Sequence, residues 1–144
     1  MTRHEVGLLD TSTLLLLPRL DAANLPVRPL ISAVTLAELA VGPLVAKDVG
    51  ERASRLAQVQ QAEADFEPLP FDAMAARAFG LVAADLRTSG RKATARAFDA
   101  MIAAIAVANG LPIYTCNPSD FMGIGGLEVV PVSHPDRGRP RAGR

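Results

Sequence analysis

The stretch that most constrains the fold is residues 97–121, where a helix that is apolar nearly all round leads into a short apolar strand. From residue 102 to 108, alanine alternates with isoleucine and valine, which favours a buried helix with no polar face. Asn109-Gly110 is a helix stop. Residues 113–115 follow as a short apolar run that is typical of a buried strand. The other elements of the chain must therefore pack around this unit.

Strands and helices alternate along the rest of the chain. Apolar runs at residues 6–9, 30–31 and 127–132 predict three further short strands. Pro131 lies in the last run and places it at an edge of the sheet, because proline cannot donate a ladder hydrogen bond. This alternation predicts an α/β fold with a central, mostly parallel sheet.

Two amphipathic helices, each with one face in water, are predicted at residues 49–64 and 72–87. They carry more apolar surface than one small core requires, so we expect them to form a groove for a partner segment or a contact between two copies. Residues 1–132 are predicted to form one domain. Residues 133–144 contain four arginines and almost nothing apolar, which predicts a flexible basic tail.

Composition narrows the class of protein. Apolar residues make up 49% and charged residues 21% of the chain, which is typical of a globular domain. Lys+Arg and Asp+Glu both number 15, so the net charge indicates no partner. The single cysteine allows no internal disulfide, and Asp10 and Pro18 interrupt the apolar stretch near the N-terminus. We therefore expect a cytoplasmic protein without a membrane segment.

Four acidic residues stand where predicted strands end or helices begin. In parallel sheets, functional groups gather at the carboxyl ends of the strands. These acids are Asp10 after the first strand, Glu38 in the helix after the second, Asp99 at the start of the central helix and Asp120 after residues 113–115.

Each acid also has a local explanation. Asp10 and Asp120 could cap turns, and Asp99 could favour the positive end of its helix. Glu38 could complete a Thr35-x-x-Glu38 capping box. As a set, however, carboxylates that converge on one edge repel one another unless a cation neutralises them. The hard cations Mg²⁺ and Mn²⁺, which prefer oxygen ligands, are the natural partners.

Four segments in register resemble one known family, the PIN-domain ribonucleases, and within it the VapC-type toxins of bacterial type II toxin–antitoxin modules. They follow that family's order and spacing, and with the helices between them they cover nearly all of the chain except its tail. The segments are Leu8-Leu9-Asp10-Thr11-Ser12, residues 31–39 (ISAVTLAEL), residues 98–104 (FDAMIAA) and residues 113–121 (IYTCNPSDF).

The resemblance implies a three-layer α/β/α sandwich and a Mg²⁺-dependent endoribonuclease that hydrolyses RNA with a metal-activated water. It makes Asp10, Glu38 and Asp99 the acids that hold the metal. The fourth position stays open between Asn117, as a contact to the metal or its water, and Asp120, as a catalytic acid that orients a metal-bound water. The implied partners are a structured RNA such as tRNA or rRNA, a cognate antitoxin protein and a second copy in a homodimer.

A basic segment precedes Asp99 in the sequence. Beside a carboxylate edge it predicts contacts with RNA phosphates, whereas considered alone it could equally be a solvated loop. Aromatic residues make up only 4%, so RNA recognition is expected to rest on backbone and shape. The candidate phosphate contacts are Arg87, Arg91, Lys92 and Arg96.

Other chemistries fit the sequence less well. The two histidines, His4 and His134, lie near the chain ends, which argues against a two-histidine ribonuclease or a zinc site. Cys116 has no histidine or cationic neighbour and is expected to be a buried thiol. The alternative function is a non-cleaving Mg²⁺-binding α/β interaction module, which an RNA cleavage assay distinguishes from a nuclease.

Overall fold

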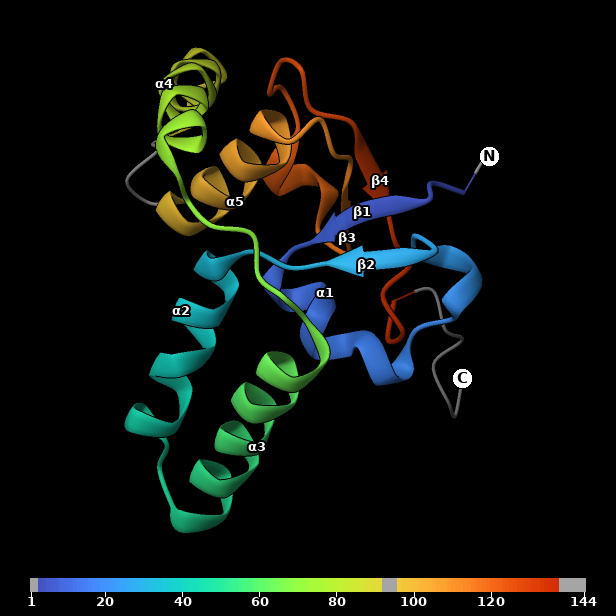
Figure 1. The fold of residues 1–144 in the computed structure, drawn as a ribbon, viewed down its shortest axis with the longest axis vertical. Helices are drawn as coiled ribbons and strands as arrows, with labels where there is room; N and C mark the ends of the chain where they lie inside the picture. The colour runs from blue at the N-terminus through green and yellow to red at the C-terminus, as the bar shows by residue number, and fades with distance from the viewer. Residues whose placement is uncertain (1–2, 92–95, 138–144) are drawn as a thin grey trace, which may run out of the picture.

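A computed structural model describes residues 3–91 and 96–137, and at its centre lies a four-stranded parallel sheet (Figure 1). The strand order is β2-β1-β3-β4, so the first strand and the strand after the central helix lie side by side in the middle. Leu8 pairs with Leu30 on one side and with Ile113 on the other. The strands are β1 (Val6–Leu9), β2 (Arg28–Leu30), β3 (Ile113–Thr115) and β4 (Val129–Pro131).

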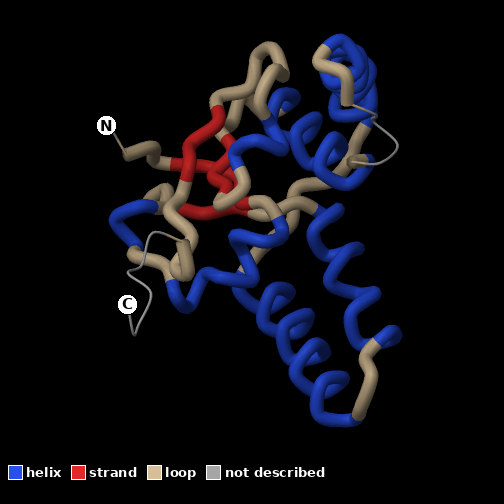
Figure 2. Tube along the Cα trace, turned by 180° about the vertical axis from the view of Figure 1, so that it is seen from behind, coloured by secondary structure: helices blue, strands red, loops and turns tan. Residues whose placement is uncertain are grey.

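Helices cover both faces of the sheet, which gives the predicted three-layer α/β/α arrangement (Figures 1 and 2). Helices α4 and α5 pack against each other on one face, and α1 lies on the other. Helices α2 and α3 form a hairpin that projects from the body of the molecule. The helices are α1 (Thr11–Leu16), α2 (Ala33–Val41), α3 (Val49–Asp65), α4 (Ala73–Thr88) and α5 (Ala97–Ala108), with short 3-10 turns η1 (Leu17–Arg19), η2 (Ala22–Asn24), η3 (Gly42–Val45) and η4 (Pro118–Phe121).

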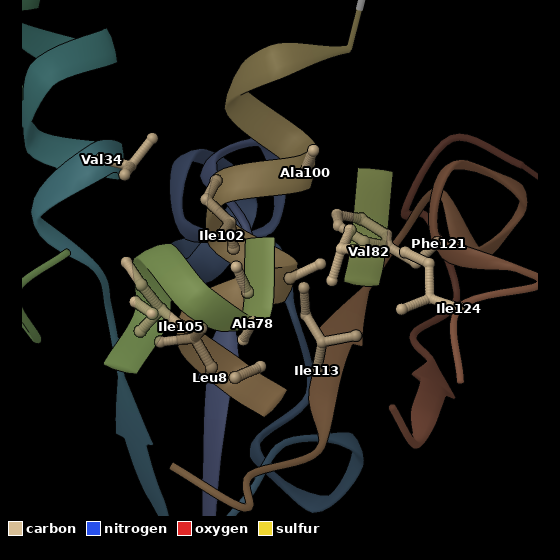
Figure 3. Packing of buried hydrophobic residues seen from close by; sticks show 14 of the residues in the cluster. Leu8, Val34, Ala78, Val82, Ala100, Ile102, Ile105, Ile113, Phe121 and Ile124 are labelled. Carbon is tan, nitrogen blue, oxygen red and sulfur yellow. The ribbon is translucent and has the colours of Figure 1, made fainter. Parts of the chain in front are cut away.

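Successive residues of the central strands point to opposite faces of the sheet and build two cores. Leu8 and Ile113 are fully buried against α4 and α5, in the cluster that Figure 3 shows. The next residues along each strand, Leu9 and Tyr114, pack with residues of α1, α2 and α3. Residues 102–106 of α5 are fully buried, which confirms the predicted central helix.

Most predicted elements are confirmed, and one strand lies elsewhere. Strand β2 occupies Arg28–Leu30 and not residues 30–31, because its pairing with β1 starts where Arg28 lies opposite Val6. Strand β4 lies at the sheet edge, as its proline predicts. The predicted tail is described as far as residue 137. None of the helices in the described ranges combines the length and apolar character that a bilayer span needs.

Candidate active site

Asp10 stands directly after β1 at the carboxyl edge of the sheet, where it caps α1. Only 3% of the residue is exposed. Its carboxylate accepts hydrogen bonds from the Thr13 N–H at 3.2 Å, from the Thr115 hydroxyl at 2.8 Å and from the Ser12 hydroxyl at 3.3 Å. Burial raises the pKa of Asp10, and these hydrogen bonds act in the opposite direction.

Glu38 reaches the same edge from α2. Its Oε1 accepts a 2.7 Å hydrogen bond from the Thr11 hydroxyl, which also lies 3.0 Å from the hydroxyl of Thr35. The capping-box explanation is wrong, because the N-cap of α2 is Ser32 and its hydroxyl accepts from the Thr35 N–H. Burial raises the pKa of Glu38, and the charge of Asp10 raises it further.

Asp99 lies in the first turn of α5, which begins at Ala97. Its pKa is raised to about 6, first by burial and then by the charges of the other three acids. Electrostatic coupling of this kind acts between groups that lie near one another. The pKa of Asp99 thus responds to the charges of the other three predicted acids, Asp10, Glu38 and Asp120.

Asp120 lies in η4, which follows β3. Its carboxylate forms an ion pair with the guanidinium of Arg96, the N-cap residue of α5. The fourth acid is thus partly neutralised by one of the arginines that the sequence assigned to RNA phosphates. The same arginine acts against the rise in the pKa of Asp99.

Asn117, the other candidate for the fourth position, is part of a hydrogen-bond network beneath the acids. Its Nδ2 donates to the Ser12 hydroxyl at 3.1 Å, and its Oδ1 accepts from Arg137 at 3.3 Å. Its backbone N–H donates to the Thr115 hydroxyl at 2.9 Å.

Hydroxyl side chains are the site residues that the sequence reasoning missed. The sequence places Thr11 and Ser12 only in a segment that resembles the PIN-domain family, and Thr115 in a buried strand and in another such segment, without a role for any of their hydroxyls. Each of them instead donates a hydrogen bond to one of the acids. Their positions in the sequence could have indicated this role, because Thr11 and Ser12 directly follow Asp10 and Thr115 is the last residue of β3.

The basic segment is only partly described. Arg87 lies exposed in the last turn of α4, and Arg96 lies beside Asp120. Arg91 is half-buried, and within the described ranges its Nη1 has no hydrogen-bond partner. Lys92 lies outside the described residues.

The donor set fits a hard divalent cation. The four side chains are carboxylates. Burial and then repulsion from the other three acids raise the pKa of Asp99, and a divalent ion would offset that repulsion. In the described part of the chain, no three His, Cys, Asp or Glu side chains are placed so that together they could hold a metal ion, so the fit rests on the chemistry of the donors. The Cys116 thiol is buried and its pKa is raised by that burial, which disfavours the reactive thiolate.

Comparison with known proteins decides the family. Residues 8–121 match the PIN domain, and this range contains all four acids. The chain belongs to the PIN-domain family. Ribonucleases of this family are metal-dependent, in agreement with the carboxylate set.

The matches place this PIN-domain protein among the VapC ribonucleases. It is 39% identical to Ribonuclease VapC5 of Mycobacterium tuberculosis over 134 residues, which cover 91% of this chain and 96% of that protein. It is 32% identical to Ribonuclease VapC1 of Rickettsia felis, over 74% of this chain and 78% of that protein.

Solved structures agree in fold. The crystal structure of VapBC-5 from Mycobacterium tuberculosis, described as a member of the VapBC family of toxin-antitoxin systems, matches with a TM-score of 0.77 and 38% identity. The match covers 89% of this chain and 99% of the VapBC-5 chain. The DNA-bound VapBC of Salmonella typhimurium matches with a TM-score of 0.68 and 27% identity, over 88% and 96% of the two chains.

Proposed function

We propose that this PIN-domain protein is the toxin of a type II toxin–antitoxin system and acts as a Mg²⁺-dependent endoribonuclease in the cytoplasm. One observation carries the proposal: the buried carboxylate of Asp10 stands at the carboxyl end of β1, and the next residue, Thr11, donates to the carboxylate of Glu38. The charges of these two acids and of Asp120 also raise the pKa of Asp99. The relatives named as VapC ribonucleases, and the neighbours described as toxin-antitoxin structures, support the same activity.

Asp10, Glu38 and Asp99 are the residues that would hold Mg²⁺, with Mn²⁺ as a substitute. When bound, the ion supplies an activated water and neutralises charge on the scissile phosphate. Thr115 and Ser12 fix the orientation of the Asp10 carboxylate by donating to it. Asp120 orients water at the rim of the group.

Thr11 has the corresponding role for Glu38, because its hydroxyl donates to Oε1 and keeps that carboxylate at the edge. In this way each of the two acids is oriented by a hydroxyl from the segment that follows β1 or from β3. No side chain has to act as a nucleophile, in keeping with the buried Cys116.

The RNA backbone would approach over the basic side of the site. Arg87 lies in the last turn of α4, Arg91 follows that helix, and Arg96 forms an ion pair with Asp120. A structured RNA such as tRNA or rRNA fits a surface that reads charge and shape with few aromatic residues.

The antitoxin would bind an apolar pocket of about 280 Å³ between α1, η1, α2 and α3. Leucines and a phenylalanine line it, and Gln58, Gln61 and Asp65 give it a polar rim. An amphipathic antitoxin segment fits this combination of apolar floor and polar edge. The homodimer would form elsewhere, on the exposed face of α4, where Met74 and Leu81 are open to solvent.

The decisive experiment incubates the purified protein with total cellular RNA and Mg²⁺ or Mn²⁺, and maps the new RNA ends. We expect specific cleavage by the wild type, none with EDTA and none by Asp99→Asn. If folded wild-type protein leaves RNA intact with both ions, the chain is a non-cleaving metal-binding module.

A further inference from the structure

The described start of the predicted tail, residues 133–137, is held against the site and is called here the C-terminal arm. Asp136 forms an ion pair with Arg19 of η1. Arg137 donates from Nη1 to the Cys116 carbonyl and from Nη2 to Asn117 Oδ1, both at 3.3 Å. The arm therefore brings a guanidinium to the carboxyl end of β3, from outside the range that matches the PIN domain.

The chemistry of arginine fixes the direction of every hydrogen bond in this network. A guanidinium only donates, so the side of the Asn117 amide that faces Arg137 must be its oxygen. The Nδ2 group then faces Ser12, whose hydroxyl accepts at 3.1 Å. The Ser12 proton is left to point at Asp10 Oδ2, 3.3 Å away. The chain of donors thus runs from Arg137 through Asn117 and Ser12 to Asp10.

We propose that Arg137 is a positioning residue, which locks the Asn117 amide with its NH₂ group toward Ser12 and Asp10. In this orientation Asn117 serves the site as a hydrogen-bond donor, and its carbonyl oxygen is turned to the arm. The sequence alone suggested a contact with the metal or its water, and the network instead supports a donor role. The inference rests on the proposed nuclease function.

A positioning role and direct RNA binding by Arg137 predict different kinetics. A guanidinium that orients Asn117 affects the chemical step, so Arg137→Ala should lower kcat about 10-fold with little change in KM. A guanidinium that binds an RNA phosphate should raise KM instead. The matched control is Arg52→Ala, which removes an exposed arginine from α3 in the projecting hairpin.

A double-mutant cycle isolates the link between the two residues. If Arg137 acts through Asn117, Arg137→Ala should have almost no further effect on kcat when Asn117 is already alanine. Thermal melts confirm that each variant is folded, which is expected because Arg137 is exposed.

A readout without RNA separates this inference from the proposed function. In the metal-free protein, the NMR signals of the Asn117 NH₂ group should shift and exchange faster with solvent in Arg137→Ala, and stay in place in Arg52→Ala. Unchanged Asn117 signals, a rise in KM alone or full additivity with Asn117→Ala would overturn the inference. A wild type that does not cleave RNA but shows the NMR effect would overturn only the nuclease proposal.

Discussion

The hydroxyl of Thr115 donates a 2.8 Å hydrogen bond to Oδ2 of Asp10 and so joins the ends of β3 and β1. The hydroxyl oxygen of Thr115 also accepts the backbone N–H of Asn117 at 2.9 Å, and Thr115 is fully buried. One side chain thereby orients an acid and shapes the turn after β3. Because 105 positions separate the two residues in sequence, only the parallel pairing of β1 with β3 brings them together.

Thr115→Val tests this relationship, since valine keeps the shape of threonine and loses both hydrogen bonds. The buried carboxylate loses a donor and the Asn117 N–H loses its acceptor, so the free energy of unfolding should fall by about 1–3 kcal/mol. RNA cleavage should fall with it. Thr88→Val is the control, because the Thr88 hydroxyl is exposed and donates to the Ala84 carbonyl of its own helix. Urea unfolding and cleavage rates should differ between the two variants, and equal behaviour contradicts the role of Thr115.

Asp99→Asn tests the repulsion among the acids. The pKa of Asp99 is about 6 in the folded chain, against an ordinary value of 3.8. Between these values the folded state binds more protons than the unfolded state, so metal-free stability should fall as pH rises from about 4 to about 6. The substitution should weaken this pH dependence, leaving the part that Asp10 and Glu38 contribute, abolish cleavage and raise stability at neutral pH by on the order of 1 kcal/mol. Urea unfolding of the wild type and of Asp99→Asn at pH 4, 5, 6 and 7.5 measures the free energy of unfolding that the prediction concerns.

A true helix cap should behave in the opposite way. Asp48 caps α3 and accepts the Glu51 N–H at 2.8 Å. Asp48→Ala should therefore destabilise the protein by about 1 kcal/mol and leave RNA cleavage normal. If Asp99→Asn follows the Asp48→Ala pattern, Asp99 is structural.

The sequence predicted those features that depend on local pattern. The apolar periodicity of residues 102–108 predicted the buried helix. Strand ends pointed to Asp10 and Asp120, since parallel strands present their carboxyl ends at one edge, and the start of the same helix pointed to Asp99. Features that depend on distant partners were not predictable. The donor to Glu38 comes from Thr11, and the N-cap of α2 is Ser32 because residue 35 is already helical. The ion pair of Arg96 with Asp120 could not be predicted either, because only the fold brings these two residues together.

Asp120→Asn tests the fourth acid, whose carboxylate forms an ion pair with Arg96. If Asp120 orients water at the metal, the variant should lose cleavage about 10–100-fold and need more Mg²⁺ for half-maximal activity. Asn117→Ala should lose less activity, because the neutral Asn117 side chain reaches the acids only through the Ser12 hydroxyl. Mg²⁺ titrations of both variants make the comparison. An unchanged rate and Mg²⁺ midpoint in Asp120→Asn would reduce the metal site to Asp10, Glu38 and Asp99.

Leu15→Glu and Leu81→Glu test the two proposed protein contacts separately. Leu15 lines the pocket and is 43% exposed, whereas Leu81 lies on α4 and is 71% exposed. Both positions already face water, so neither charge should disrupt folding. Leu15→Glu should weaken binding of the cognate antitoxin and leave the dimer intact, and Leu81→Glu should do the reverse. Calorimetric titration with the antitoxin and light scattering measure the two effects. Identical behaviour of the two variants contradicts the assignment.

Gly80→Ala gives a further test of the face on α4. Glycine weakens a helix interior, and a Cβ at this position would meet nothing within 4 Å, so the chain's own packing does not require glycine here. Alanine should therefore stabilise the monomer by about 0.5–1 kcal/mol. If a second copy packs closely at Gly80, the same methyl group should loosen the dimer. Melting temperatures at low and high protein concentration then move in opposite directions.

Gly7→Ala is the control for the Gly80→Ala experiment, because its effect should not depend on protein concentration. A Cβ on Gly7 would lie 2.7 Å from Cε1 of Tyr114, so alanine should destabilise β1 and lower the melting temperature at every concentration. If Gly80→Ala instead raises the melting temperature equally at low and high concentration, no second copy approaches this face of α4. The dimer contact would then have to lie elsewhere on the surface.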